Sequence, residues 1–238
     1  RPAAFSIRRL YQALGDEAVA DVSPVYIFPA VWKNPWGTDR RAIQSMGVDP
    51  GKDQFDTPGF AAGLPLLRQQ DAVLFDAASR PEFGDMRARF AADGVITTEV
   101  NNRTVKVVGL LEIGPSFGID GTIMTSIDNW LRLFPDKPRD EIQLGLIRLR
   151  PGADPVVARD RLRTELPHDV LVLTKQDFVN RERSYWNHAT PIGFVFAFGA
   201  IMGLVVGAII VYQILFADVS EHLNEYATLR AIGYRNRF

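Results

Sequence analysis

Three histidines, His168, His188 and His222, are the first residues to consider as catalytic groups or metal ligands. They lie in three separate settings, and none belongs to an HxH or HExxH pattern, which would bring two ligands to one metal ion. The chain has no cysteine, so a thiolate nucleophile, a thiolate metal site and a disulfide are all excluded. The sequence therefore predicts no catalytic residue and no metal site.

Motifs for acyl transfer and phosphate binding give no better case. Residues 114–118 read GPSFG and match the letters of GxSxG, but they lack the strand-to-helix context of a nucleophile elbow. The chain contains no GxxxxGKS or GxxxxGKT, so we expect no phosphate-binding loop. The glycine-rich residues 114–121 do not join a strand to a helix and favour a structural turn. Asp76, Glu82 and Asp85 could be imagined as paired carboxylates, but a solvated helix start explains them better. We expect no cofactor and no enzyme.

The most informative polar pattern lies near the end of the chain, where residues 218–233 should form a short helix. Asp218 or Ser220 is the expected N-cap of this helix. Arg230 in the last turn complements the helix dipole, and Gly233 suits the left-handed position that ends many helices.

The same helix should carry an acidic face. Glu221 and Glu225 are four residues apart, so they share one face and mildly repel each other. That local cost indicates that the face meets a basic partner. A helix lying on the membrane surface is the alternative, and it is less favoured because such helices usually carry Lys and Arg on the polar face. The expected apolar stripe is formed by Leu223, Tyr226, Ala227 and Ile232.

This helix would follow the most hydrophobic stretch of the chain. Residues 191–216 contain one strongly polar side chain, Gln213, and no formal charge lies between Arg183 and Asp218. As a helix this stretch would be about 39 Å long, more than the thickness of a bilayer core. We therefore expect a transmembrane helix at 190–216, the alternative being a buried helix of a large globular domain. Positions typical of an aromatic belt are occupied by Tyr185, Trp186 and Tyr212.

Three glycines in the apolar stretch predict a contact with another helix. Gly199, Gly203 and Gly207 form a GxxxGxxxG pattern and share one face. Without three side chains, a partner helix can approach closely, which is how helices associate in lipid. A chance triplet is the alternative, because glycine is common in transmembrane helices.

Charge gives little further guidance. The formal net charge is −1, so there is no electrostatic case for a nucleic-acid partner. The basic residues on the two sides of the apolar stretch are too evenly balanced to set its orientation. The chain does not begin with Met, and its first residues lack the apolar core of a signal peptide. We expect a piece of a longer protein.

Residues 1 to about 185 should form a folded domain of mixed α and β structure. Apolar spacing favours a helix at 3–14. Two prolines make the strand-like residues 19–32 an irregular edge strand, which could pair with 41–48.

Regular patterns return near the end of this domain. Strict alternation predicts a strand at 141–150, and Asp154 should cap a helix at 154–166. A second strand is expected at 169–175, which completes a strand–helix–strand unit. Most of the apolar face of the helix would come from Val156, Val157, Leu162 and Leu166.

We expect the strand–helix–strand unit to pair with the N-terminal elements. Residues 1–55 and 138–185 would then form one split βαβ lobe, and the turn-rich residues 56–137 would be an inserted mixed β lobe. Within the insertion we expect a buried strand at 72–76, a hairpin at 95–114 and a helix at 126–134.

The patterns resemble a known family. The motif ExxxExxxLRAIG is similar to the cytoplasmic segment after the second span in ABC transporter permeases of the FtsX/MacB type, which runs close to ERTREIGILRALG. Here HLNE stands where that family has RTRE. The motif is formed by Glu221, Glu225, Leu229, Arg230, Ala231, Ile232 and Gly233. Segments over nearly the whole chain look like DevC-type permeases: RRLYQALG, SPVY, WKNP, VLFDAASRPEFG, TTEVN, GLIRLRPGA, TPIGF, VGAIIVYQIL and DVSEHLNEYATLRAIGYRN.

The resemblance implies a permease of the bacterial inner membrane with four spans. Residues 1–185 would be a two-lobed, MacB-like periplasmic domain, 190–216 the second span and 218–233 a cytoplasmic coupling helix. Implied partners are a separate ABC ATPase, a second permease copy, a periplasmic membrane-fusion adaptor and an outer-membrane channel. The exported substrate would be a lipid or another amphiphile. Coupling to the ATPase would fall to Glu221, Glu225, Leu229, Arg230 and Gly233.

Two other functions stay open at this point. An FtsX-like regulator would share the span and the coupling helix, but it would signal to a periplasmic partner without moving a substrate. A tethered periplasmic hydrolase is disfavoured by the missing catalytic residues.

Overall fold

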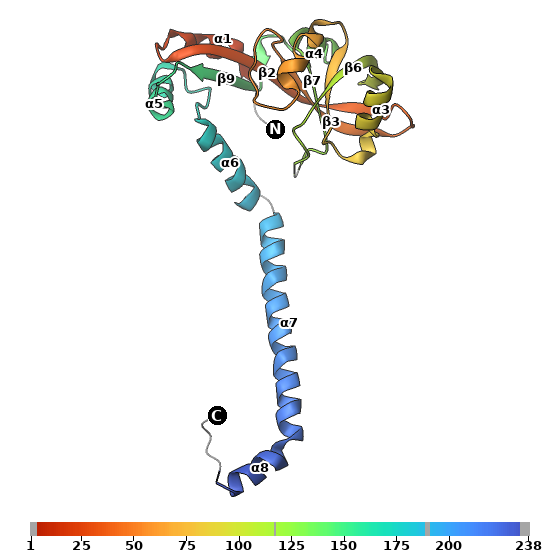
Figure 1. Ribbon diagram of the computed structural model, residues 1–238. Coiled ribbons are helices and arrows are strands. Elements are labelled where there is room, and N and C mark those ends of the chain that lie inside the picture. Colours follow the sequence, from red (N-terminus) through yellow and green to blue (C-terminus); the bar gives the residue numbers. More distant parts are fainter. Residues whose placement is uncertain (1–3, 117, 189–190, 234–238) are drawn as a thin grey trace. The chain divides into compact units, whose positions relative to one another are not determined.

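The computed structural model describes residues 4–116, 118–188 and 191–233 (Figure 1). The chain divides into a folded unit, residues 1–172, and a helical unit, residues 173–238. The fold class is confirmed: a mixed α/β unit is followed by a long apolar helix. Each unit is described by itself below.

The folded unit contains nine strands, seven of which form its main sheet, within the described residues. They are β1 (Phe5–Ser6), β2 (Val19–Lys33), β3 (Arg40–Val48), β4 (Ala72–Asp76), β5 (Ile96–Val100), β6 (Arg103–Leu111), β7 (Thr122–Ser126), β8 (Glu141–Ile142) and β9 (Leu144–Leu149). Its helices are α1 (Ile7–Gln12), α2 (Phe60–Gly63), α3 (Met86–Asp93), α4 (Ile127–Leu133) and α5 (Pro155–Glu165), with short 3-10 turns η1 (Ala13–Gly15), η2 (Leu66–Arg68) and η3 (Pro81–Phe83).

The main sheet closes on itself. Its strand order is β3-β7-β4-β6-β5-β2-β9, and β2 also pairs with β3. The pairs β3–β7 and β4–β6 are parallel, and the remaining pairs are antiparallel. Six strands therefore form a ring, and β9 extends from it along the first half of β2. The small strands β1 and β8 form a separate pair.

Strand β2 is central, so the prediction of an edge strand at 19–32 is wrong. It pairs with β9 through Val19–Val25 and with β3 through Tyr26–Lys33. The prediction failed because both prolines are accommodated without breaking a ladder. Because each half of β2 has its main partner on one side, a missing N–H is harmless when it points to the other side.

Backbone contacts show which way the prolines point. Ile27 and Val31 donate their N–H groups to the side chains of Gln143 and Asn101, at 2.9 and 2.8 Å, and not to β3. Pro29 lies midway between these two residues and therefore faces the same way.

The carbonyl of Val22 shows the same for the first half of β2. It accepts a hydrogen bond from Lys52 Nζ at 2.6 Å, and so it points away from β9. Pro24, two residues on, shares that direction. Lys52 also bonds Asp21 Oδ1 at 2.5 Å, and this hydrogen bond lowers the pKa of the Asp21 carboxyl.

Aromatic side chains from distant strands meet in the core. The ring centroids of Tyr26 and Trp130 are 5.1 Å apart, and those of Trp130 and Phe134 are 4.5 Å apart. The Trp130 indole is buried and donates to Ser45 Oγ at 3.1 Å. Gly47 lies against this indole, since a Cβ built there would come within 2.8 Å of the Trp130 Cβ and Cγ atoms.

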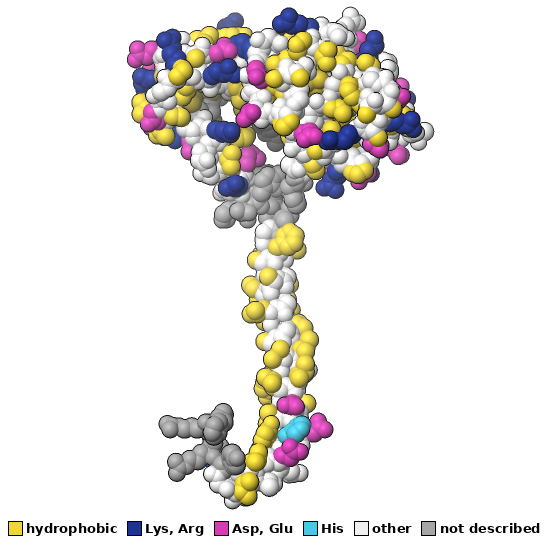
Figure 2. Space-filling model, in the orientation of Figure 1, with side chains coloured by type: hydrophobic (Ala, Val, Ile, Leu, Met, Phe, Trp, Pro, Cys, Tyr) yellow, Lys and Arg dark blue, Asp and Glu magenta, His cyan; other side chains and the backbone are white. Residues whose placement is uncertain are grey.

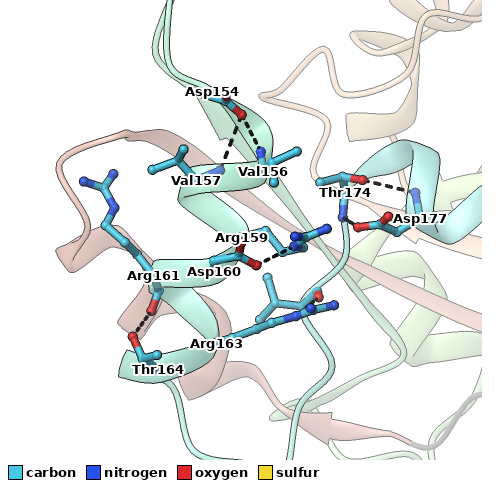
Figure 3. A network of polar contacts seen from close by, with 11 residues as sticks. Asp154, Val156, Val157, Arg159, Asp160, Arg161, Arg163, Thr164, Thr174 and Asp177 are labelled. Carbon is cyan, nitrogen blue, oxygen red and sulfur yellow. Dashed lines mark hydrogen bonds and ion pairs between the residues drawn. The ribbon is translucent and has the colours of Figure 1, made fainter.

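Several local predictions are confirmed. Strand β4 is buried along its whole length, and β3 pairs with β2 as expected. Asn101 and Asn102 form the hairpin turn between β5 and β6 with positive φ values of 51° and 61°. Helix α4 is capped by Ser126, and α5 by Asp154, whose carboxylate accepts from Val156 and Val157 N–H (Figure 3).

Other local predictions are wrong. The first helix begins at Ile7, not at residue 3, because Ser6 caps it and β1 precedes it. Residues 169–175 contain no strand. Val156 and Val157 are exposed, and Ala158, Leu162 and Leu166 provide the buried face of α5. Pairing of β3 with β7 and β2 with β5 links segments of both expected lobes in one sheet, and the lobe boundaries stay a prediction.

The Gly47–Trp130 contact gives a test of the core. Gly47→Ala should destabilise the folded unit by about 1–3 kcal/mol, because the new methyl group would overlap a buried indole that is fixed by its hydrogen bond. Urea denaturation of the whole chain in detergent, followed by near-UV circular dichroism, measures this change. Gly15→Ala is the matched control, since nothing lies within 4 Å of its added Cβ, and it should leave the midpoint unchanged.

Candidate functional site

The helical unit begins with α6 (Lys175–His188), and a capping box sets its start. Asp177 donates its N–H to Thr174 Oγ1 at 3.1 Å, and Thr174 donates its N–H to Asp177 Oδ2 at 3.2 Å (Figure 3). The reciprocal bonds satisfy two N–H groups that a helix start leaves open. Thr174 is therefore the N-cap of α6. The side chains of Tyr185 and Trp186, expected in an aromatic belt, lie outside the described part.

Helix α7 (Pro191–Glu221) is the dominant element of this unit. Its residues Gly193–Glu221 are long and apolar enough to cross a membrane, with a mean hydropathy of 2.7 over the best window, and none of that window is buried within the chain. Within the described residues this is the single helix with these properties. Large apolar side chains cover it (Figure 2), for example Phe194 at 73% exposed and Leu204 at 76% exposed. In water such a surface would be costly.

The three glycines of α7 are open. Nothing lies within 4 Å of a Cβ built on Gly199, Gly203 or Gly207. Successive positions four residues apart advance by about 40° around a helix, so the three glycines form one shallow face. The face is therefore free for close approach by a second helix, and the role predicted for it stays a prediction.

A short helix, α8 (Leu223–Ala231), follows α7 directly. The predicted N-caps, Asp218 and Ser220, are wrong, since both lie in the last turn of α7. The break falls at His222, whose φ and ψ are −96° and 9°. Helix α7 extends past the apolar residues 191–216, because the polar residues from Asp218 to Glu221 also adopt the helical conformation.

His222 is bonded to the last turn of α7. Its backbone N–H donates to the Asp218 carbonyl at 3.2 Å, and its Nδ1 lies 2.9 Å from the same oxygen. A carbonyl oxygen can only accept, so the proton of this contact belongs to Nδ1. The side chain then competes for a carbonyl at the helix end, which is a physical reason for the break at this residue.

The ends of α8 match its dipole. Glu225 lies in its first turn and Arg230 in its last turn. Gly233 adopts a positive φ of 100°, as predicted, and donates its N–H to the Arg230 carbonyl. Glu221 belongs to the end of α7 instead, where a negative charge opposes the dipole. Exposed apolar side chains on α8 and beyond it are Leu223, Tyr226, Leu229 and Ile232.

Acidic side chains gather at the junction of α7 and α8. Asp218, Glu221 and Glu225 lie within two turns of His222. Figure 2 shows magenta acidic side chains and a cyan histidine together at the lower end of the apolar helix. The arrangement thus consists of a long apolar helix and a short acidic end.

The folded unit contains no metal-binding cluster of His, Asp or Glu among its described residues. Asp85 caps α3 and accepts from Ala88 N–H, in line with the predicted helix start. Asp76 is different, because it is fully buried and not solvated. It accepts N–H bonds from Ala78, Ile113 and Gly114 at 2.9–3.1 Å.

The sequence indicated a solvated helix start for Asp76 and did not predict its structural role. Its position at the end of the continuous apolar run 72–75, which forms a buried strand, is the signal that could have indicated it. The carboxylate holds the start of loop 113–121 against β4.

A surface cluster links three strands of the sheet. Glu99 of β5 bonds Lys33 Nζ at 2.9 Å and Arg40 Nη2 at 3.0 Å. The hydrogen bond from Lys33 lowers the pKa of Glu99, and Arg40 adds to the effect. The cluster joins the ends of β2, β3 and β5. The Glu99 carboxylate therefore has a structural role, and its lowered pKa makes it a weaker base than an ordinary glutamate.

Comparisons with known proteins concern the fold of the chain. No protein-family profile matches it, and no curated protein matches it in sequence. The fold is similar to the periplasmic region of MacB from Actinobacillus actinomycetemcomitans, with 10% identity and a TM-score of 0.48, covering 67% of this chain and 72% of that one. It is also similar to the extracellular domain of the noncanonic ABC-type transporter YknZ from Gram-positive bacteria, with 14% identity and a TM-score of 0.49, covering 73% and 91%.

Burial of α7 in lipid can be tested by single-cysteine labelling, since the chain has no cysteine of its own. Leu204→Cys should react with a maleimide about 10-fold more slowly in membranes than after detergent denaturation, because a bilayer core excludes water and lowers the thiolate fraction. Val95→Cys, on an exposed position of the folded unit, should react at equal rates in both conditions. Equal rates for both variants would contradict a membrane-embedded α7.

Proposed function

We propose that this chain is part of the permease subunit of an ATP-driven exporter with a mechanotransmitting mechanism. The observation that carries the proposal is the motif ExxxExxxLRAIG, which falls on the junction of α7 and α8 directly after an apolar helix. An acidic helix end at this place suits a basic groove on a cytoplasmic ATPase. Residues 1–185 would then lie in the periplasm, and ATP hydrolysis would occur on the partner chain.

The coupling step follows from the helix chemistry. ATP-driven closure of the ATPase would displace α8 through Glu221, Glu225 and Arg230, while Leu229 and Gly233 fix its packing and its end. Helix α7 is one continuous α-helix of 31 residues, so it can transmit a displacement along its axis. The periplasmic domain would respond by changing its hold on an adaptor or a substrate.

The further partners of the proposal rest on the resemblance to DevC-type permeases. A second permease copy would pack on the glycine face, and a periplasmic adaptor and an outer-membrane channel would continue the export path. The substrate would be a lipid or another amphiphile. The proposal also includes two periplasmic lobes. One is formed by residues 1–55 and 138–185, and the other by residues 56–137.

Charge reversal on α8 tests the coupling. Glu225→Lys in the complete permease should lower co-purification of the ATPase and transport about 10-fold or more, because it places a cation at the start of a helix and against a basic partner. Pull-down of the ATPase and a transport assay measure these effects. Glu165→Lys is the matched control, since Glu165 is exposed at the end of α5, and it should leave both readouts unchanged.

The coupling proposal has a clear opposite outcome. If Glu225→Lys retains full transport and full ATPase association, Glu225 is not a coupling residue. Purification of a peptidoglycan hydrolase in place of an adaptor and a channel would favour the regulatory function over export.

The glycine face has its own test. Gly203→Leu should reduce dimer crosslinking within the membrane severalfold, because its side chain would keep two helices apart. Ala208→Leu places the same side chain about 140° away around α7 and should leave crosslinking unchanged. A dimer that is undisturbed by Gly203→Leu would exclude this face from the interface.

A further inference from the structure

Helix α7 carries four aromatic side chains as two stacked pairs. The ring centroids of Phe194 and Phe198 are 6.0 Å apart with 20° between the ring planes, and those of Tyr212 and Phe216 are 6.0 Å apart with 25° between the planes. All four side chains are exposed. One pair lies near the start of the apolar residues 191–216 and the other near their end.

Both pairs lie on the same side of the helix. Each residue of an α-helix is rotated by about 100° from the one before it, so Tyr212 follows Phe194 after about five full turns, and Phe216 follows Phe198 after the same rotation. The two pairs are therefore in line along the axis. Exposed aliphatic side chains on the same side fill the length between the pairs: Ile201, Val205 and Ile209. We call the surface formed by the four rings and these three residues the aromatic face.

The aromatic face is opposite the three glycines. The middle of the aromatic face is about 160° around the axis from Gly203, the central glycine. Nothing lies within 4 Å of a Cβ built on Gly203 or on its neighbours Gly199 and Gly207. Helix α7 thus has one side without side-chain bulk and an opposite side with large rings at two levels.

Close helix packing does not suit the aromatic face. Helices approach each other closely in lipid where small residues line the contact. Ring pairs at two levels would hold a second backbone away and leave the aliphatic surface between them uncovered. A close partner helix suits the glycine side better, so the aromatic face needs a different cover.

The length of the aromatic face matches a bilayer. Its inner rings, Phe198 and Tyr212, are about 21 Å apart along the axis, and its outer rings, Phe194 and Phe216, are about 33 Å apart. The hydrocarbon core of a bilayer, about 30 Å thick, lies between these two values. Each pair would therefore lie at one boundary between acyl chains and headgroups, and the aliphatic residues between the pairs would lie among the acyl chains.

The hydroxyl group of Tyr212 fits the same level. Tyr212 precedes Asp218, the first charged residue after the apolar stretch, by about 9 Å along the axis. A phenol hydroxyl finds no hydrogen-bond partner in hydrocarbon, whereas water and lipid headgroups supply one. Tyrosine is accordingly enriched at membrane–water boundaries.

We propose that the aromatic face is a lipid-contact surface, which phospholipids of both leaflets cover. The stacked pairs lie level with the two headgroup boundaries, and protein contacts α7 from its other sides. Helix α7 therefore lies at the periphery of any helix bundle that it joins. The inference requires that α7 crosses a membrane, and it does not depend on the proposed exporter function.

Spin labels on single cysteines test the lipid contact in the whole chain, reconstituted in phosphatidylcholine vesicles. Collisions of the label are measured with oxygen, which concentrates in hydrocarbon, and with a polar nickel chelate, which stays in water. The oxygen-to-chelate ratio should be at least about 5-fold higher at Val205→Cys than at Val95→Cys, because Val95 is exposed on the folded unit. A low oxygen collision rate at Val205→Cys would show a face covered by protein and would overturn the proposal.

The same measurement gives the level of the ring pairs. The oxygen-to-chelate ratio should be highest at Val205→Cys and about 3-fold or more lower at both Phe194→Cys and Phe216→Cys, because water reaches the headgroup boundary. A ratio at either end as high as that at Val205→Cys would contradict the proposed level of that pair.

A label on the glycine side separates this inference from the proposed dimer contact. Ile210→Cys lies about 140° around the axis from Val205→Cys. A low oxygen collision rate at Ile210→Cys with a high rate at Val205→Cys supports both proposals. High rates at both positions support the lipid contact and contradict a protein contact on the glycine side.

Discussion

The folded unit depends on one strand that serves two partners. Strand β2 pairs with β9 through its first half and with β3 through its second half, and both pairings need a ladder that is not interrupted. Pro24 and Pro29 can occupy this strand because their missing N–H groups point to the other side. Without this agreement of register and proline position, the ring of six strands could not close, and β9 would lose the one strand that pairs with it among the described residues.

The sequence predicted those helix starts and turns that depend on residue type and on contacts between a side chain and the backbone a few residues away. Ser126, Asp154 and the pair Asn101–Asn102 each act over a few residues, so their caps and turn follow from residue type. The apolar helix followed from length and lack of charge. Strand order did not follow, since pairing of β3 with β7 depends on contacts between segments far apart in the chain.

The candidate site shows the same limit. Gly233 and Arg230 have the expected positions, because helix ends obey local rules. The N-caps failed, because a helix that is already formed continues through Asp218 more readily than a new one begins there. The strand predicted at 169–175 is wrong, because the hydrogen bonds of a strand need a neighbouring strand, and alternation of side chains along one segment does not predict that neighbour.

The end of α7 has a consequence for its place relative to lipid headgroups. Three acidic residues, Asp218, Glu221 and Glu225, lie at this end. Within the described part of the segment one basic residue, Arg230, offsets their charge. An anionic leaflet attracts basic residues by about 1 kcal/mol each, and it repels acidic ones in the same sense. In the proposed permease, an anionic leaflet would therefore repel the acidic junction of α7 and α8 formed by Asp218, Glu221 and Glu225.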